Sequence, residues 1–279
     1  FIDFEIVFID NCSKDNTKDI ISHYDSRLKY YRTPKFMTLG EARTFGLVYC
    51  TSEFLAFLDT DDIWEPTLLE ESLSILENRL NKVDMTYSNI DFIDEQSKYN
   101  KTLFKKKMPS GRIFRELIKG YFITIASVVV KRECVKEVGD RFNAEYQLIA
   151  DLELFTDISY RYNISYIDKV LASVRKHENS LTNNKFVRFP LETQIYINHL
   201  KNRIDNFESI YSKELDYLKI TLTYQFALSY WMNGNNKKAK MKLKKILFSR
   251  KKYIIVYVFM TFSYEFFAKT MNFFKLGNY

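Results

Sequence analysis

The sequence contains only three cysteines, Cys12, Cys50 and Cys134. They are odd in number and form no Cys-x-x-Cys pair, so neither a disulfide framework nor a thiolate zinc site is expected. Sparse, unpaired cysteines are typical of proteins from a reducing compartment. The cysteine usage therefore indicates a cytosolic protein.

The sequence also lacks a long apolar run. No stretch of about eighteen or more uncharged apolar residues occurs, so no membrane-spanning helix is expected. The chain opens at Phe1 rather than Met, and its first residues run into an expected strand without a signal-peptide pattern. We therefore expect that an amino-terminal piece of the protein is missing from this sequence.

The composition is typical of a basic globular protein. Of 279 residues, 46% are hydrophobic, which is ample for one large domain or for a domain with an appendage. Lys and Arg number 42 against 35 Asp and Glu, and the pI is about 9.0. This charge excess suits nucleic acid, an anionic membrane or phosphorylated substrates as partners.

Apolar runs and helical periodicities alternate along the first two thirds of the chain. Helices are expected after Thr38, where Glu41 completes a capping box, and after Pro66, where leucines recur at helical intervals as far as Leu80. The alternation predicts an α/β fold with a layered, mostly parallel sheet. The expected strands are residues 5–9, 28–32, 53–58, 83–87, 122–130, 164–167 and 170–174, with a polar, irregular segment over residues 89–109.

Three carboxylates follow one of these apolar runs within four positions. In FLDTDDIWEP, residues 57–66, Asp59, Asp61 and Asp62 follow directly after Leu58. Carboxylates crowded at a strand end repel each other unless a cation or a hydrogen-bond network stabilises them, and a hard divalent metal is the obvious candidate. The alternative is an acidic turn in which Asp59 or Asp61 caps the next helix.

A second acid, Asp10, also stands directly after an apolar strand. In layered α/β sheets, helices cover both faces, and the ligand crevice lies beyond the carboxyl ends of the strands. We therefore expect Asp10 and Asp59 to point into the same crevice, so that the two acidic turns form one candidate site.

Beyond residues 175–177 the pattern becomes purely helical. Residues 217–248 resemble a helical hairpin, nine Lys or Arg lie between Lys237 and Lys252, and residues 253–267 are rich in Tyr, Phe, Ile and Val. A cationic stretch followed by such a helix is typical of a helix that lies on an anionic membrane surface. The alternative is a solvated basic face followed by a helix packed in a core, and Glu265 argues against deep insertion.

Five segments together resemble the family 2 glycosyltransferases of GT-A fold. They are EIVFIDNCSKDNT, LGEARTFGL, FLAFLDTDDIWEP, the Asp151-Leu152-Glu153-Leu154 segment and VLASVRKHENSLT, and they span Glu5 to Thr182 in the order of the family. The first strand and nucleotide-facing loop of the family pattern would precede Phe1. The resemblance implies a GT-A fold, a Rossmann-like sheet that binds a nucleotide-diphospho-sugar.

The resemblance also implies roles for residues on the donor side of the site. Asp10, with Asn11 beside it, would contact the base or ribose of the nucleotide, and Asn11 is a departure from the more usual second acid. Arg43 would lie near the base or diphosphate, and its alternative role is that of a surface arginine. Asp59 and Asp61 correspond to the DXD motif: Asp59 reaches the ribose or the metal, and Asp61 takes Mn²⁺ or Mg²⁺, with Asp62 as a further ligand or a supporting neighbour.

The remaining implied roles concern the acceptor side and the diphosphate. Asp151 matches the base that activates the acceptor, in a chain that has Ala150 where the family usually has another acid. From the residues alone, Asp151 would be a helix N-cap. Arg175 and His177 match the R-x-H element that closes over the diphosphate, where His177 completes the metal shell.

These observations predict a metal-dependent, inverting glycosyltransferase of class EC 2.4, a hexosyl- or N-acetylhexosaminyltransferase. It would consist of a GT-A domain over residues 1–184 and a helical region over residues 185–279 that contacts acceptor, partner or membrane.

The expected partners are a nucleotide-sugar donor, with uridine as the favoured nucleoside, and a glycan or lipid-linked glycan acceptor of polysaccharide synthesis. The expected location is the cytoplasm, peripherally at the inner face of the cell membrane. No nucleic-acid motif is visible. The alternatives are a non-catalytic GT-A-like binding module and a basic membrane-surface protein.

Overall fold

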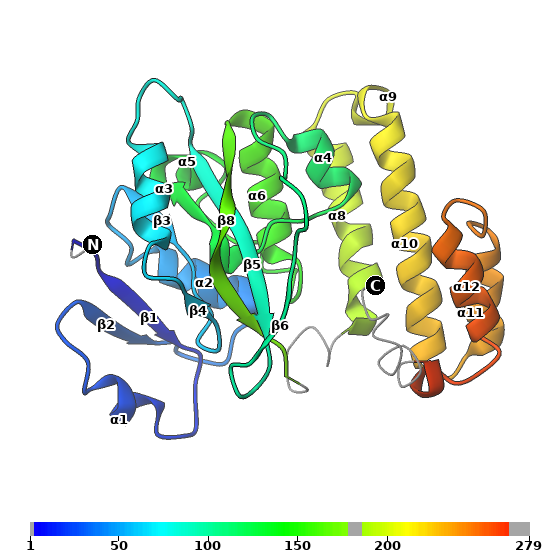
Figure 1. The fold of residues 1–279 in the computed structure, drawn as a ribbon, viewed down its shortest axis with the longest axis horizontal. Coiled ribbons are helices and arrows are strands. Elements are labelled where there is room, and N and C mark those ends of the chain that lie inside the picture. Colours follow the sequence, from blue (N-terminus) through cyan, green and yellow to red (C-terminus); the bar gives the residue numbers. More distant parts are fainter. Residues whose placement is uncertain (1–2, 178–185, 268–279) are drawn as a thin grey trace. The chain divides into compact units, whose positions relative to one another are not determined.

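A computed structural model describes residues 3–177 and 186–267 of the chain (Figure 1). The chain divides into two compact units, Phe1–Ser180 and Leu181–Tyr279, and each is described by itself below. The expected domain boundary at residue 184 lies outside the described residues.

The first unit is an α/β domain with two sheets. Its helices are α1 (Thr17–Ile21), α2 (Leu39–Leu47), α3 (Leu68–Leu76), α4 (Phe114–Lys119), η1 (Ile125–Ser127), α5 (Arg132–Glu137) and α6 (Ala150–Arg161). Its strands are β1 (Ile6–Asp10), β2 (Leu28–Arg32), β3 (Phe54–Ala56), β4 (Ile63–Trp64), β5 (Met85–Ile93), β6 (Tyr99–Thr102), β7 (Val129–Lys131) and β8 (Ile164–Arg175).

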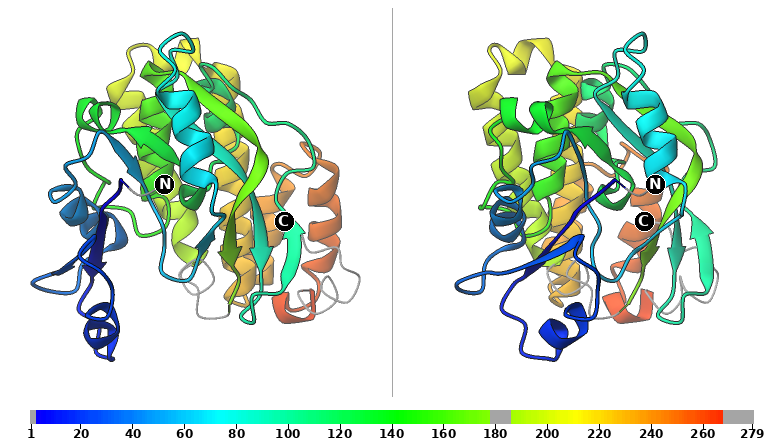
Figure 2. Two further views of the ribbon diagram at one scale, coloured as in Figure 1. Left: turned by 60° about the vertical axis from the view of Figure 1, so that its left-hand side comes forward. Right: turned by 90° about the vertical axis from the view of Figure 1, so that its left-hand side faces the viewer.

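The smaller sheet contains only β1 and β2, which pair in parallel with Ile6 opposite Leu28 and Asp10 opposite Arg32. In both views of Figure 2 the two strands (blue) lie to one side of the larger sheet. The apolar side chains of β1 are at most half-buried, although a run such as IVFI is typical of a strand covered on both faces. Gly46 of α2 lies against β1 so closely that a Cβ there would come within 2.9 Å of Ile9.

The larger sheet has six strands in the order β3-β7-β5-β8-β4, with β6 paired to β5. Only β5 and β8 are parallel in this sheet, and its other pairs are antiparallel. The α/β architecture is as expected, but the sheet is mixed rather than mostly parallel. The long pairing of β5 with β8 forms the middle of the sheet and carries β4 at its edge.

One hydrophobic core of this unit lies between the larger sheet and α3. Leu68, Leu73 and Leu76 of α3 cluster with Ile90 and Ala172 of the sheet. These leucines are spaced by three to five residues, so they share one face of the helix. Leu80, which the sequence pattern included in the same helix, lies beyond its end and is 91% exposed, so that part of the expectation is wrong.

The other local predictions agree with the structure only in part. The capping box of Thr38 and Glu41 is formed, and the two short strands expected over residues 164–174 are one continuous strand, β8. The segment 122–130 is not one strand, because Ser127 N–H donates to the Thr124 carbonyl at 2.9 Å and closes the turn η1 before β7 begins. Residues 89–109 are not wholly irregular, because they contain the end of β5 and all of β6.

The described part of the second unit is helical. Its elements are η2 (Phe186–Arg188), α8 (Phe189–Arg203), α9 (Phe207–Ile210), α10 (Ser212–Met232), α11 (Asn236–Lys244) and α12 (Lys251–Phe259). The predicted helical hairpin is α10 and α11, joined through Gly234 at φ 74°, a backbone angle that glycine adopts without strain. The two helices and α12 enclose a core that contains Trp231 and Val256. Within the described residues, no helix has both the length and the apolarity needed to cross a bilayer.

Candidate active site

The three carboxylates of the acidic turn lie between β3 and β4. The turn closes where Asp62 N–H donates to the Asp59 carbonyl at 3.0 Å, so the carboxylates are held close in space as well as in sequence. Burial, with a smaller effect from the negative charges of Asp59 and Asp61, raises the pKa of Asp62 to about 6, although a hydrogen bond from the Arg175 backbone lowers it in part. The repulsion expected from the sequence is therefore present in the fold.

Pairing of β4 with the end of β8 brings Arg175 and His177 to this turn. Ile63 lies opposite Ser173, two residues before Arg175. The Arg175 backbone N–H donates to Asp62 Oδ1 at 3.0 Å, and its Nε donates to the Asp61 carbonyl at 3.0 Å. The Arg175 Nη1 group also donates to the Asp94 carbonyl at 2.7 Å. The side chain of Arg175 thus ties the acidic turn to the β5–β6 hairpin.

His177 and Asp61 form the pair best suited to a metal ion. The His177 Nε2 atom lies 3.0 Å from Asp61 Oδ2. Asp62 faces the Arg175 backbone instead, and no group of three or more His, Cys, Asp or Glu in residues 3–177 and 186–267 is arranged to hold a metal. One carboxylate and one imidazole fit an ion whose other ligands come from a diphosphate and water, and a nitrogen ligand suits Mn²⁺ better than Mg²⁺.

Arg43 connects the acidic turn to the opposite wall of the site. Its Nη2 group lies 2.9 and 3.1 Å from the two oxygens of Asp59. The guanidinium group also lies over the Phe142 ring, 5.6 Å from its centroid, and Phe57 packs edge-on against the same ring. The side chain of Arg43 is largely buried, so it is a fixed charge in the site rather than a surface arginine.

Asp151 occupies the first turn of α6 and is not its cap. The N-cap position is Ile149, so the expectation drawn from the residues alone is wrong. The Tyr121 hydroxyl donates to Asp151 Oδ2 at 3.0 Å. Burial raises the pKa of Asp151, while the positive charge of Arg43 and the Tyr121 hydrogen bond lower it in part. A partly buried carboxylate with a raised pKa that is held in one orientation is suited to accept a proton.

Asp10 and Asn11 form a separate network at the ends of β1 and β2. The Asp10 carboxylate is almost fully buried and accepts hydrogen bonds from Tyr30, Arg32 and the Ser13 backbone. Burial raises its pKa, but hydrogen bonds from Tyr30 and Ser13 outweigh this and leave the pKa below the ordinary value.

The amide of Asn11 is paired on both sides with the Met37 backbone, at 2.9 Å each way. Met37 is followed by Thr38, the residue that caps α2. Asn11 therefore braces the start of the helix that carries Arg43. In the described part of the chain, the hydrogen bonds of Asp10 and Asn11 stay within this network and do not reach the acidic turn.

Two residues of the site stand outside the sequence motifs. Tyr121 contacts Asp151, and Phe142 supports Arg43. Neither stands at a recognisable spacing from its partner, and each is one of many aromatic residues in this chain. Only a long-range contact could have distinguished them.

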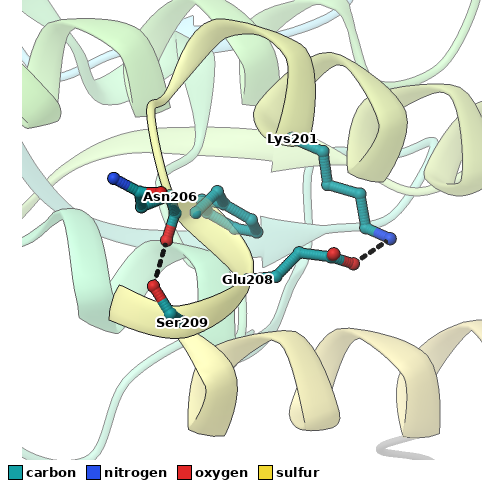
Figure 3. Close-up of a pocket in the computed structure, with 5 residues that line it drawn as sticks. Lys201, Asn206, Glu208 and Ser209 are labelled. Carbon is teal, nitrogen blue, oxygen red and sulfur yellow. Dashed lines mark hydrogen bonds and ion pairs between the residues drawn. The ribbon is translucent and has the colours of Figure 1, made fainter.

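A hollow of about 340 Å³ lies in the second unit, lined by Lys201, Asn206, Phe207, Glu208 and Ser209 (Figure 3). Its charged groups pair with each other, Lys201 with Glu208 at 2.5 Å, and Ser209 donates to the Asn206 carbonyl at 2.9 Å. These pairings satisfy the lining, and we assign no function to this hollow.

Comparison with known sequences gives consistent results. Residues 1–139 match the family model described as Glycosyl transferase family 2. One similar protein is UDP-Glc:alpha-D-GlcNAc-diphosphoundecaprenol beta-1,3-glucosyltransferase WfgD from Escherichia coli, 28% identical over 189 residues, which cover 67% of this chain and 71% of WfgD. Another is TuaG from Bacillus subtilis (strain 168), a glycosyltransferase assigned to teichuronic acid biosynthesis, 24% identical over 187 residues that cover 66% of this chain and 71% of TuaG.

Comparison with solved structures supports the fold. The structure of S. aureus TarS residues 1–349 in complex with UDP-GlcNAc superposes with a TM-score of 0.60 at 17% sequence identity. The match covers 87% of this chain and 76% of the TarS chain. At this identity, the likeness concerns the arrangement of the backbone and not the ligand.

The contacts around Asp151 predict an ordered change in its titration. We expect the pKa of Asp151 to lie above the ordinary aspartate value, because burial disfavours the charged form. Tyr121→Phe should raise it further, because the change removes a hydrogen bond that favours the carboxylate. Carboxyl-carbon NMR titration of the two proteins measures both shifts. Tyr99→Phe, which removes an exposed hydroxyl far from α6 in sequence, is the matched control. An unchanged or lowered pKa in Tyr121→Phe would contradict this account.

Proposed function

Because this chain belongs to glycosyltransferase family 2, we propose that it transfers one sugar, with inversion at the anomeric carbon, from a uridine-linked nucleotide sugar to a glycan or lipid-linked glycan. One observation supports this most: the acidic turn, the Arg175–His177 segment and the Arg43–Asp59 pair converge on one place. The names of the similar proteins give the chemistry. WfgD is named for UDP-glucose and a diphosphoundecaprenol-linked acceptor, and TarS was solved with UDP-GlcNAc.

The donor diphosphate would lie between the acidic turn and the end of β8. Asp61 and His177, with Asp59 beside them, would hold Mn²⁺ or Mg²⁺. Such an ion neutralises the charge that develops on the departing diphosphate. Arg175, fixed by the Asp61 and Asp94 carbonyls, and Arg43, fixed over Phe142, would add two positive charges without any side-chain reorganisation.

The nucleoside would lie at the ends of β1 and β2. Asp10 and Asn11 remain our candidates for contact with the base or ribose, together with the loop through Met37 that Asn11 braces. Since Asp10 is buried and already accepts three hydrogen bonds, its strongest effect would be to hold Tyr30, Arg32 and this loop in position. Arg43, at the next turn of α2, would lie between the nucleoside and the reacting centre.

The acceptor would react on the Asp151 side of the sugar. The Asp151 carboxylate would remove the proton from the acceptor hydroxyl as its oxygen attacks the anomeric carbon and the bond to the diphosphate breaks. The hydrogen bond donated by Tyr121 helps to hold the carboxylate in one orientation. Transfer to a lipid-linked acceptor would take place at the inner face of the cell membrane, with the protein itself in the cytoplasm.

The donor assignment predicts a heat of binding for UDP in the presence of Mn²⁺ and hydrolysis of one member of a panel of nucleotide sugars. Isothermal calorimetry and a UDP-release assay measure these. Because the metal ion would connect Asp61 to the diphosphate, UDP binding should weaken when a chelator removes Mn²⁺. No heat with any uridine nucleotide and no hydrolysis would instead favour a binding module that has the fold without the activity.

The metal assignment predicts that Asp61→Ala lowers turnover by roughly 100-fold or more, because removal of a metal ligand costs several kcal/mol of stabilisation in the transition state. Steady-state kinetics over a Mn²⁺ titration measure the loss. Asp205→Ala, which removes an exposed carboxylate of the second unit, is the control and should have no effect. Full activity of Asp61→Ala would remove Asp61 from the metal site.

The base assignment predicts a different kinetic result for Asp151→Asn. The amide keeps the size of the side chain but cannot accept the proton, so kcat for transfer should fall by about 10²- to 10⁴-fold. Donor binding should be preserved, since the change leaves the diphosphate side intact. Calorimetry with UDP and kinetics of transfer separate the two effects. Undiminished transfer by Asp151→Asn would refute the base role.

A further inference from the structure

The outer side of α12 is apolar although it faces solvent. Ile254, Ile255 and Val258 are 43%, 47% and 60% exposed, and Phe262 and Phe266, just after the helix, are each 50% exposed. Their rings lie 5.1 Å apart. We call these five residues the α12 face. The opposite side of α12, with Tyr253 and Val256, is already buried in the core of the unit, so packing within the described residues accounts for only one side of this helix.

Positive charges border the α12 face. Lys251 is exposed and lies three and four positions before Ile254 and Ile255, so it heads the same side of the helix. Lys240 of α11 extends over the ring of Tyr257, 5.6 Å from its centroid, and Tyr257 lies one residue before Val258. In Figure 1, α11 and α12 pack beside each other at the end of α10. Lys251 and Lys240 therefore lie on or beside the helix that carries the α12 face.

The surrounding sequence has a single sign of charge. No Asp or Glu occurs between Tyr217 and Tyr264, whereas ten Lys or Arg do. Several of these cations lie over aromatic rings of α10, as Lys238 does over Tyr230 and Lys242 over Phe226. A stretch of chain without carboxylates attracts anions, because it contributes positive charge alone.

We propose that the α12 face and its flanking lysines dock onto the surface of an anionic lipid bilayer. The side chains of the α12 face would enter the boundary between headgroups and acyl chains, and Lys240 and Lys251 would contact the lipid phosphates. A soluble polyanion would satisfy the lysines but would leave the large apolar side chains in water. An acidic protein partner would need a surface complementary in shape to this face, and no groove in the described part of this unit indicates one. A bilayer is fluid, so it needs only exposed apolar side chains flanked by positive charge.

This proposal stands apart from the transfer reaction, because docking needs neither donor nor Asp151. Flotation of the full chain with vesicles tests it directly. We expect strong binding to vesicles of equal parts phosphatidylglycerol and phosphatidylcholine, weak binding to phosphatidylcholine alone, and loss of binding as salt is added. Failure to float with the anionic vesicles at low salt would overturn the proposal.

Two double variants separate the contributions of charge and apolar contact. Lys240→Gln with Lys251→Gln should weaken partitioning into anionic vesicles on the order of 30-fold, from the usual contribution of a lysine near such a surface. Lys105→Gln with Lys106→Gln, two exposed lysines of the first unit, is the matched control and should bind normally. Equal losses in the two variants would indicate a general charge effect and would overturn the assignment to this surface.

Ile254→Gln with Val258→Gln should weaken partitioning on the order of 10-fold or more, although the net charge is unchanged. Glutamine is at least as good a helix former as isoleucine or valine, so α12 should persist, and circular dichroism checks this. Ile20→Gln with Leu80→Gln, at exposed apolar positions of the first unit, is the control. If this α12 variant floats normally while soluble polyphosphate displaces the vesicles, the surface binds polyanions rather than lipid, and the proposal is wrong.

Discussion

The pairing of β4 with the end of β8 is the constraint on which the rest of the candidate site depends. Two residues of β4 are enough to place the acidic turn beside Arg175 and His177, which are more than a hundred positions away in sequence. The backbone N–H of Arg175 then donates directly to Asp62, so a hydrogen bond connects the end of β8 to the acidic turn. Because β8 is also the long partner of β5, the position of the turn is tied to the most extensive pairing in the sheet.

The charges of the site balance only when its distant parts are together. Burial and the charges of Asp59 and Asp61 both disfavour the ionised form of Asp62 and raise its pKa. Arg43 from α2 and the Arg175–His177 segment from β8 supply the compensating groups, and both are held by contacts with residues outside the turn. Such an arrangement is costly for stability alone, and clusters of this kind are typical of functional sites.

The second unit has apolar side chains on its surface as well as in its core. Its core of aromatic and aliphatic residues is complete around Trp231, yet α12 continues to present large apolar side chains to solvent on its other side. Several nearby cations, such as Lys238 and Lys240, lie over aromatic rings.

Most of the local structure could be predicted from the sequence. The helices after Thr38 and Pro66, the strand that leads to Asp10, the presence of a strand before the acidic turn and the helical character of the last third all followed from capping residues and apolar periodicity, although β3 ends at Ala56, two residues before the expected end. These signals arise between residues close in the chain, so they can be recognised without knowledge of the fold. The errors fell where tertiary contacts override a local preference, as in the turn at Ser127, the extension of β5 and the exposure of Leu80.

The composition and order of the motifs, read from the sequence alone, determined the family, the α/β class and the identity of the candidate residues. The tertiary structure alone decided which of them meet. It separated Asp10 and Asn11 into a bracing network, paired Asp61 with His177, fixed Arg43 on Phe142 and gave Asp151 a partner in Tyr121. The physical reason is that strand pairing and side-chain packing act over distances in sequence at which no periodicity or spacing carries information.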